Sequence, residues 1–158
     1  MSTNSFIGIL ENNQIRGNYC HFNGFLDDNG KMLFEHYQDE DKIHKLINLG
    51  SLSYLDEEVE PKSDIPHTFY KPQKNVTLAY HRDRKDPLKV YEFKKMESFK
   101  EHISSSTYEY IYIRFKGVWF YVKKLNGKFV AYPLDNEKCF EDGYKFHEHK
   151  LLKQMMEE

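Results

Sequence analysis

Residues 107–132 constrain the fold more than any other part of the sequence. They form three runs rich in β-branched and aromatic residues, separated by the dipeptides Lys116-Gly117 and Asn126-Gly127. A two-residue loop ending in glycine between such runs is a strong hairpin signal. The segment therefore predicts a three-stranded antiparallel meander.

The two loops also determine the register of this meander. Counting outward from the first loop gives apolar pairs on one face: Phe115 with Val118, Ile113 with Phe120, and Ile111 with Val122. The other face is mostly aromatic and basic: Tyr110, Tyr112, Arg114, Trp119, Tyr121, Lys123, Val130 and Tyr132. We expect the apolar face to be buried and the aromatic-basic face to be exposed for binding. The alternative is that helices cover this face and its aromatic side chains belong to the core.

The N-terminal third predicts a hairpin followed by two helices. Residues 6–10 and 14–21 are β-rich and flank a pair of asparagines, which favours a turn. A helix is expected over residues 31–37. A second should begin after the N-cap residue Asp39 and end before Gly50.

The remaining elements follow from short patterns. Expected strands cover residues 51–55, 75–82 and 90–93, and an expected helix over 96–103 places Met96, Phe99 and Ile103 inward. Residues 56–74 are acidic, contain three prolines and predict a long surface loop, which in a compact domain is usually functional or mobile. A C-terminal helix is expected from residue 142.

Antiparallel strands with interspersed helices, without regular β-α-β alternation, indicate an α+β fold. We expect an antiparallel sheet of about five to seven strands with helices packed on one face. The 158 residues are enough for one core, so a single domain over residues 1–158 is expected.

Charge and cysteine content exclude several classes of protein. The formal net charge is −2, which does not favour direct binding to nucleic acid or to an acidic membrane. Cys20 and Cys139 lie far apart, which excludes a disulfide scaffold and a four-cysteine zinc site. No apolar run is long enough to span a bilayer, and the first residues do not resemble a signal peptide. We therefore expect a soluble cytoplasmic protein without metal or cofactor.

Residues 80–85 concentrate cations where a predicted strand leaves the sheet. The guanidinium groups of Arg82 and Arg84 suit phosphate or carboxylate ligands. Alternatively, Asp83 and Asp86 neutralise much of this charge in a salt-bridged strand end. Aromatic and imidazole rings elsewhere can supply stacking or packing. The predicted ligand-binding residues are Tyr19, His21, Tyr80, His81, Arg82, Arg84 and Trp119.

No catalytic residue is assigned from the sequence. Cys20 is adjacent to His21, but consecutive strand side chains face opposite sides, so a thiol-imidazole pair is not expected. On a helix, His147 and His149 would lie about 200° apart and could not share a metal ion. Phosphate-loop, dinucleotide-binding and nucleophile-elbow motifs are absent.

Several blocks together resemble a widespread family of small tailed-phage proteins. The blocks are Tyr19-Cys20-His21-Phe22-Asn23-Gly24, Asn29-Gly30-Lys31, His36-Tyr37, residues 46–55 (LINLGSLSYL) and Tyr80-His81-Arg82-Asp83-Arg84. The family pattern has Trp-Asp in place of Phe22-Asn23, often a proline soon after Gly24, and a glycine in place of Lys85. The resemblance covers roughly residues 5–122. It implies a phage accessory protein in the cytoplasm of a bacterial host, and it implies no reaction.

Three hypotheses follow. The first is a non-enzymatic binding protein that counters a host defence system, by sequestering a nucleotide-like signal or by inhibiting a host protein. The second is a hydrolase or transferase acting on a nucleotide or nucleic acid, with His21, His36 or His81 as general acid or base. The third is a structural phage protein that self-associates through the aromatic face.

Overall fold

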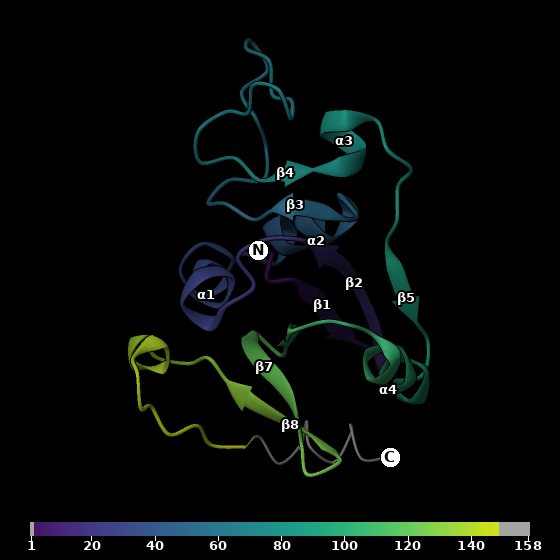
Figure 1. Ribbon diagram of the computed structural model, residues 1–158, viewed down its shortest axis with the longest axis vertical. Coiled ribbons are helices and arrows are strands. Elements are labelled where there is room, and N and C mark those ends of the chain that lie inside the picture. The colour runs from purple at the N-terminus through teal and green to yellow at the C-terminus, as the bar shows by residue number, and fades with distance from the viewer. Residues whose placement is uncertain (1, 149–158) are drawn as a thin grey trace.

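The computed structural model describes residues 2–148 and contains an open, mixed eight-stranded sheet with four α-helices (Figure 1). The strands are β1 (Ser5–Glu11), β2 (Gln14–Cys20), β3 (Leu52–Tyr54), β4 (Leu78–Ala79), β5 (Tyr91–Phe93), β6 (Tyr110–Phe115), β7 (Val118–Leu125) and β8 (Lys128–Pro133). The α-helices are α1 (Lys31–His36), α2 (Glu40–Asn48), α3 (Tyr80–Arg84) and α4 (Met96–Ser105). A π-helical turn, η1 (Leu26–Gly30), precedes α1, and a 3-10 turn, η2 (Glu137–Phe140), follows β8.

The predicted α+β class is confirmed, with one strand more than the expected maximum. The strand order is β4-β3-β2-β1-β6-β7-β8, and β5 pairs with the outer side of β2. The β6–β7 hairpin has the predicted register, with Phe115 opposite Val118 and Ile113 opposite Phe120. The N-terminal hairpin is also present as predicted. β1 lies in the centre of the sheet, antiparallel to β2 and parallel to β6.

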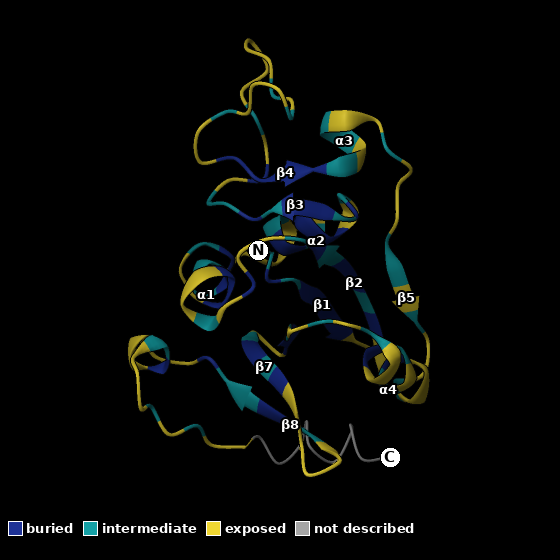
Figure 2. Ribbon diagram, viewed as in Figure 1, coloured by how far each residue is buried: buried dark blue, intermediate teal, exposed yellow. Residues whose placement is uncertain are grey.

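Helices cover both faces of the sheet, so the prediction of helices on a single face was wrong (Figures 1 and 2). α1 and α2 pack on one face, where Leu33, Ile43 and Leu46 meet Ile7 and other sheet residues. α4 packs on the opposite face through Phe99 and Ile103, as the sequence predicted for its inward residues. Alternation along β1 supplies apolar side chains to both cores, which is why this strand is buried on both sides.

The centre of the aromatic-basic face of the meander is buried and most of its rim is half-buried, which corrects the expectation of an exposed binding face; Lys123 alone of these eight residues is exposed. Tyr112 and Trp119 have no exposed area, because α1 and α2 pack against this face. The Trp119 indole donates to the carbonyl of Tyr37 over 2.8 Å. Arg114 is 3% exposed, and its guanidinium donates to Glu40 Oε1 over 2.9 and 3.0 Å. These side chains belong to the core and its rim.

The capping predicted for α2 is confirmed. The Asp39 carboxylate accepts a hydrogen bond from the Lys42 amide over 3.0 Å, which satisfies one of the free N–H groups of the first turn. Gly50 follows the helix with a φ of 77°, a conformation that favours glycine. β3 lies within the strand expected over residues 51–55. Residues 56–74 form no helix or named strand, as expected for a surface loop.

Two predicted elements differ from the structure. The strand expected over residues 75–82 is only Leu78–Ala79 long, because the chain turns into α3 at Tyr80. The predicted C-terminal helix is not present over residues 142–148, where Gly143 has a φ of 80° and the chain runs irregularly. Phe146 instead packs against Tyr121 and Tyr132 of the meander. The rest of that predicted helix, including His149, lies outside the described residues.

Over residues 2–148, no helix combines the length and the apolar character needed to cross a membrane.

Candidate functional site

The block Tyr-His-Arg-Asp-Arg forms the single-turn helix α3 because Asp83 supplies its N-terminal hydrogen bond. The Asp83 carboxylate accepts from the Ala79 amide over 2.8 Å, at the residue that precedes the helix. At the other end, Lys85 has a φ of 63°, and the Asp86 amide donates to the carbonyl of Tyr80 over 3.1 Å. The turn directs the side chains of this block to two different environments.

Arg82 is a structural residue, which corrects its assignment as a ligand contact. Its guanidinium donates to both oxygens of Asp83, over 2.8 and 3.1 Å. It also donates to the carbonyls of Val59 and Thr77, over 2.7 and 2.8 Å. All three guanidinium nitrogens are therefore engaged within the chain, and the Asp83 side chain is only 3% exposed. The hydrogen bonds from Arg82 to Val59 and Thr77 join the loop before β4 to α3.

Two further side chains, His67 and Gln73, hold the loop of residues 56–74 in place. His67 is nearly buried; its Nε2 lies 3.0 Å from the carbonyl of Thr77, and its Nδ1 accepts from the Gln73 amide over 2.9 Å. The Gln73 side chain donates to the carbonyls of Lys62 and Ile65 and accepts from the Lys62 amide over 2.8 Å. The sequence predicted the loop but not these contacts, which make it an ordered arm.

The arm ends in a tight turn that presents aromatic side chains. The Lys71 amide donates to the backbone carbonyl and the hydroxyl of Thr68, over 3.2 and 3.0 Å. Tyr70, within this turn, is fully exposed. The neighbouring Phe69 ring stacks on Tyr80 of α3, with centroids 5.3 Å apart.

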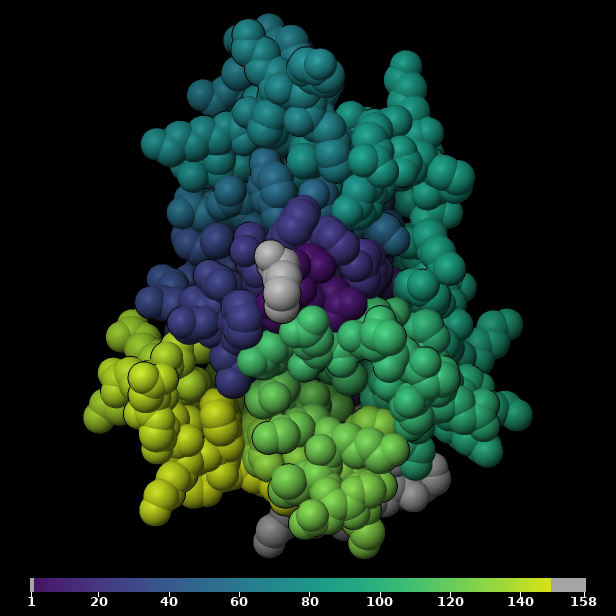
Figure 3. All heavy atoms as spheres, in the orientation of Figure 1, coloured from purple at the N-terminus to yellow at the C-terminus, as the bar shows by residue number. Residues whose placement is uncertain are grey.

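Arg84 packs against the Phe69 and Tyr80 rings. Its guanidinium carbon lies 4.7 Å from the centroid of Phe69 and 4.8 Å from that of Tyr80. The guanidinium also makes two hydrogen bonds to Asp86, over 2.9 and 2.7 Å, and these lower the pKa of that carboxyl. We define the tip surface as Ile65, Phe69, Tyr70, Tyr80 and Arg84. It lies at the end of the molecule formed by the arm and α3 (Figure 3).

His81 lies on α3 beside this surface. It is exposed, and its Nδ1 is 2.8 Å from the carbonyl of Asp86. Its contact therefore stabilises the turn after the helix, while the rest of the ring faces solvent.

Tyr19 and His21 lie at the end of β2 and contact each other. The Tyr19 hydroxyl is 2.5 Å from His21 Nδ1, and the His21 amide donates to the carbonyl of Leu52 over 2.9 Å. Burial raises the pKa of Tyr19, a hydrogen bond from Asn4 opposes this, and the nearby Tyr80 adds to the rise. The two residues thus lie on the side of the sheet that Tyr80 also approaches.

A cluster of rings that sequence analysis missed continues from Tyr19. Tyr108 stacks obliquely on Tyr19 at 6.4 Å, and its hydroxyl is 2.8 Å from His102 Nε2. Burial raises the pKa of Tyr108, so its hydroxyl keeps its proton. Burial and the charge of Lys89 lower the pKa of His102. These residues come from α4 and from the segments flanking it, and no local pattern signals their meeting.

Cys20 and Trp119 are core residues. Cys20 is fully buried on the face opposite Tyr19, and burial raises the pKa of its thiol to about 12. His21 contacts Tyr19 on the other face, so the expected placement of Cys20 and His21 on opposite sides of the strand is confirmed. Trp119 has no exposed area and so cannot serve as the predicted ligand contact.

The seven predicted site residues therefore occupy separate places rather than one pocket. Tyr80 and Arg84 belong to the tip surface, with His81 beside them. Tyr19 and His21 lie on the sheet, while Arg82 and Trp119 have internal contacts. Among residues 2–148, no three His, Cys, Asp or Glu side chains are grouped so that they could hold a metal ion. Comparisons with protein-family models, with curated proteins and with solved structures found no match.

Proposed function

We propose that this chain is a phage accessory protein that acts in the host cytoplasm by binding and inhibiting a host protein, and that the tip surface makes the contact. The observation that supports this is the ordered presentation of a fully exposed Tyr70 beside the Phe69-Arg84-Tyr80 stack. Tyrosine and arginine are enriched among the residues that dominate protein-protein affinity.

The contacts within the arm favour binding for an entropic reason. A loop that is already ordered loses little conformational freedom when a partner binds, so more of the contact energy appears as affinity. His67, Gln73 and Arg82 supply this order through hydrogen bonds to backbone groups of the arm. The engagement of Arg82 also supports a protein partner over a phosphate ligand, because its guanidinium already makes four hydrogen bonds within the chain and so has no pair of N–H groups left for a bidentate anion.

Photo-crosslinking tests the proposal. A photoreactive phenylalanine analogue is placed at Tyr70 or, as a control, at Leu125, which is also exposed but lies on the β7–β8 hairpin at the opposite end of the molecule (Figure 1). A bacterial protein should crosslink at position 70 and not at position 125.

The captured protein is then titrated with purified variants. Tyr70→Ala should weaken its binding by about thirtyfold, the loss typical of a dominant interface residue, and Leu125→Ala should leave it unchanged. Equal crosslinking at both positions, or equal affinity of the Tyr70→Ala variant, would show that the tip surface is not the contact.

A nucleotide-directed function is the second candidate, because Tyr19, His21, Tyr108 and His102 form a continuous cluster of hydroxyl and imidazole groups. Calorimetry and turnover assays with cyclic dinucleotides and ADP-ribose test it. Binding or turnover should be lost in His21→Ala and retained in the control His44→Ala, a histidine on α2 that is paired with Glu11. Absence of heat and of turnover with every nucleotide would remove this candidate.

A further inference from the structure

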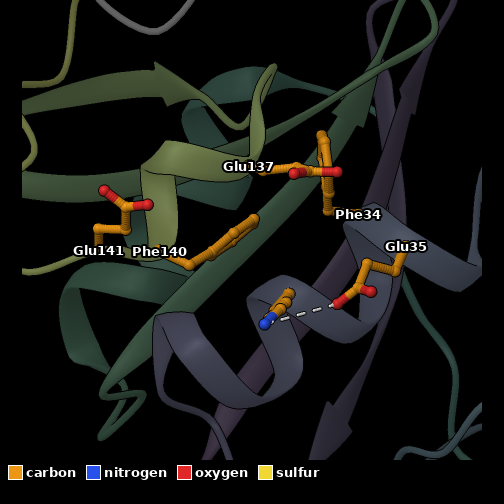
Figure 4. Close-up of a pocket in the computed structure, with 6 residues that line it drawn as sticks. Phe34, Glu35, Glu137, Phe140 and Glu141 are labelled. Atoms are coloured by element: carbon orange, nitrogen blue, oxygen red, sulfur yellow. Dashed lines mark ion pairs between the residues drawn. The ribbon is translucent and has the colours of Figure 1, made fainter.

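A cavity of about 340 Å³ lies between α1 and η2, away from the predicted site residues (Figure 4). Its walls come from two segments that are distant in the sequence. α1 contributes Lys31, Phe34 and Glu35, and the segment around η2 contributes Glu137, Phe140 and Glu141.

Two aromatic rings form the apolar part of this cavity. The centroids of Phe34 and Phe140 are 5.5 Å apart, and the rings are tilted by 59°. Both rings extend from their elements toward the space between α1 and η2 (Figure 4). Both side chains are only partly buried, so an incoming group can contact them. Aromatic faces of this kind attract cations as well as alkyl chains.

A second cavity of about 330 Å³ continues along α1 and shares Lys31 and Glu35 with the first. The two cavities together are lined by six carboxylates: Asp27, Asp28, Glu35, Glu57, Glu137 and Glu141. Among the described residues only two of these have an ion pair, Glu35 with Lys31 and Glu57 with His36, both at 3.9 Å. Burial raises the pKa of Asp28, and the charge of the neighbouring Asp27 adds to the rise.

The two cavities together form the α1–η2 cleft, and no arginine of the described residues offsets its negative charge. Each of the four arginines has a carboxylate partner elsewhere: Glu92, Asp83, Asp86 and Glu40, for Arg16, Arg82, Arg84 and Arg114. The formal net charge of the chain is only −2, yet carboxylates without an ion pair among the described residues are concentrated around this aromatic-lined cleft.

We propose that the α1–η2 cleft docks a lysine- or arginine-bearing segment of a partner protein. The aliphatic stem of the incoming side chain packs on Phe34 and Phe140, and its cationic head lies among Glu35, Glu137 and Glu141. The second cavity, with Asp27, Asp28 and Glu57, accommodates the next basic residue along the segment. The negative charge of the cleft favours a positively charged segment as its occupant. The cleft is separate from the tip surface, and this proposal does not depend on the function proposed for that surface.

Fluorescence anisotropy tests the proposal. The ligands are labelled hexalysine and labelled hexaglutamate, and unlabelled spermidine is the competitor. Hexalysine should bind and hexaglutamate should not. The double variant Glu137→Gln/Glu141→Gln should weaken hexalysine binding by about tenfold, given roughly 0.5–1 kcal/mol for each exposed ion pair. The matched control Glu97→Gln/Glu101→Gln removes two exposed carboxylates from α4 and should change binding less than about twofold.

A variant that keeps every charge separates docking in the cleft from diffuse attraction. Phe140→Leu retains an apolar side chain and removes the ring, so the fold is kept while the aromatic surface on which the aliphatic stem packs is lost. Hexalysine affinity should fall by about two- to fivefold. In ¹⁵N spectra, added hexalysine should shift the amides of residues 31–35 and 137–141.

Several results would each overturn the proposal. These are absence of hexalysine binding, equal effects of the two glutamate pairs, unchanged affinity of Phe140→Leu, and spectral shifts located elsewhere. Complete displacement by spermidine at an equal concentration of charge would overturn it as well, because the cleft would then bind small polyamines without recognising a polypeptide.

Discussion

Replacing Arg82 by alanine should show that Arg82 contributes far more to the stability of the fold than Arg84, the other arginine of the same block. In the native structure the Arg82 guanidinium makes two hydrogen bonds to Asp83 and two to backbone carbonyls. Its removal takes the guanidinium from the Asp83 carboxylate, which is 3% exposed and keeps the Ala79 amide and, at 3.4 Å, His67 Nε2 as neighbours. Loss of one member of a buried ion pair costs about 3–5 kcal/mol. Because the Arg82 side chain is 23% exposed, we expect a loss of about 3 kcal/mol, the lower end of that range.

The measurement is urea unfolding followed by the fluorescence of Trp119, the single tryptophan and a buried one. Arg84→Ala is the matched control, because Arg84 also pairs with an aspartate but is half exposed, so its loss should destabilise the protein far less. Arg82→Lys should not restore stability, since an ammonium cannot reproduce the forked contacts. Hydrogen exchange in Arg82→Ala should increase first at the Glu58 and Thr77 amides, which bond the start of the arm to residues 75–77 before β4. Equal destabilisation by Arg82→Ala and Arg84→Ala would refute the structural role of Arg82.

Four further predictions follow from buried or capping groups. Asp39→Ala should destabilise the protein by about 1 kcal/mol in the same urea assay, since it removes the N-cap of α2. Asp39→Asn should retain most of the stability, because asparagine also caps helices. Trp119→Phe should cost about 2 kcal/mol, because the carbonyl of Tyr37 loses its donor inside the core; a cost near zero would mean that water replaces the indole. In a Cys139→Ser background, Cys20 should resist alkylation at pH 8.5 until urea unfolds the chain. Folding raises the pKa of the Cys20 thiol from 9.0 to about 12. The neutral thiol therefore contributes fully to the free energy of unfolding below pH 9, and this contribution declines as the pH rises toward 12. Urea unfolding curves at successive pH values measure the decline.

Local patterns predicted the hairpins because their determinants are adjacent in the sequence. The loop residues Lys116 and Asn126 adopt positive φ angles, followed by glycines that do the same, as two-residue loops of this kind require. With the loops placed, counting residues determines the pairing. The N-cap Asp39 and the C-terminal Gly50 likewise act within a few residues of the helix that they delimit.

The sequence predictions were wrong where contacts between residues distant in the sequence determine the structure. Residues 75–82 alternate like a strand, but Asp83 reaches back to the Ala79 amide and the chain turns into α3. The aromatic face of the meander has the composition of a binding surface, yet α1 and α2 cover it. The tip surface depends on Phe69 meeting Tyr80 across the arm, and the α1–η2 cleft joins residues about a hundred positions apart. Neither juxtaposition is encoded in any short window of the sequence.

The parallel pairing of β1 with β6 has a consequence for synthesis on the ribosome. Ser5 lies opposite Tyr110 and Leu10 opposite Phe115, so the first strand to emerge acquires this neighbour only after about a hundred further residues have been made. Until then the nascent chain carries a hydrophobic strand with one open edge, which is a site for pairing with other chains. A chain released before residue 110 should therefore aggregate, whereas one that extends through β7 and β8 can close the centre of the sheet.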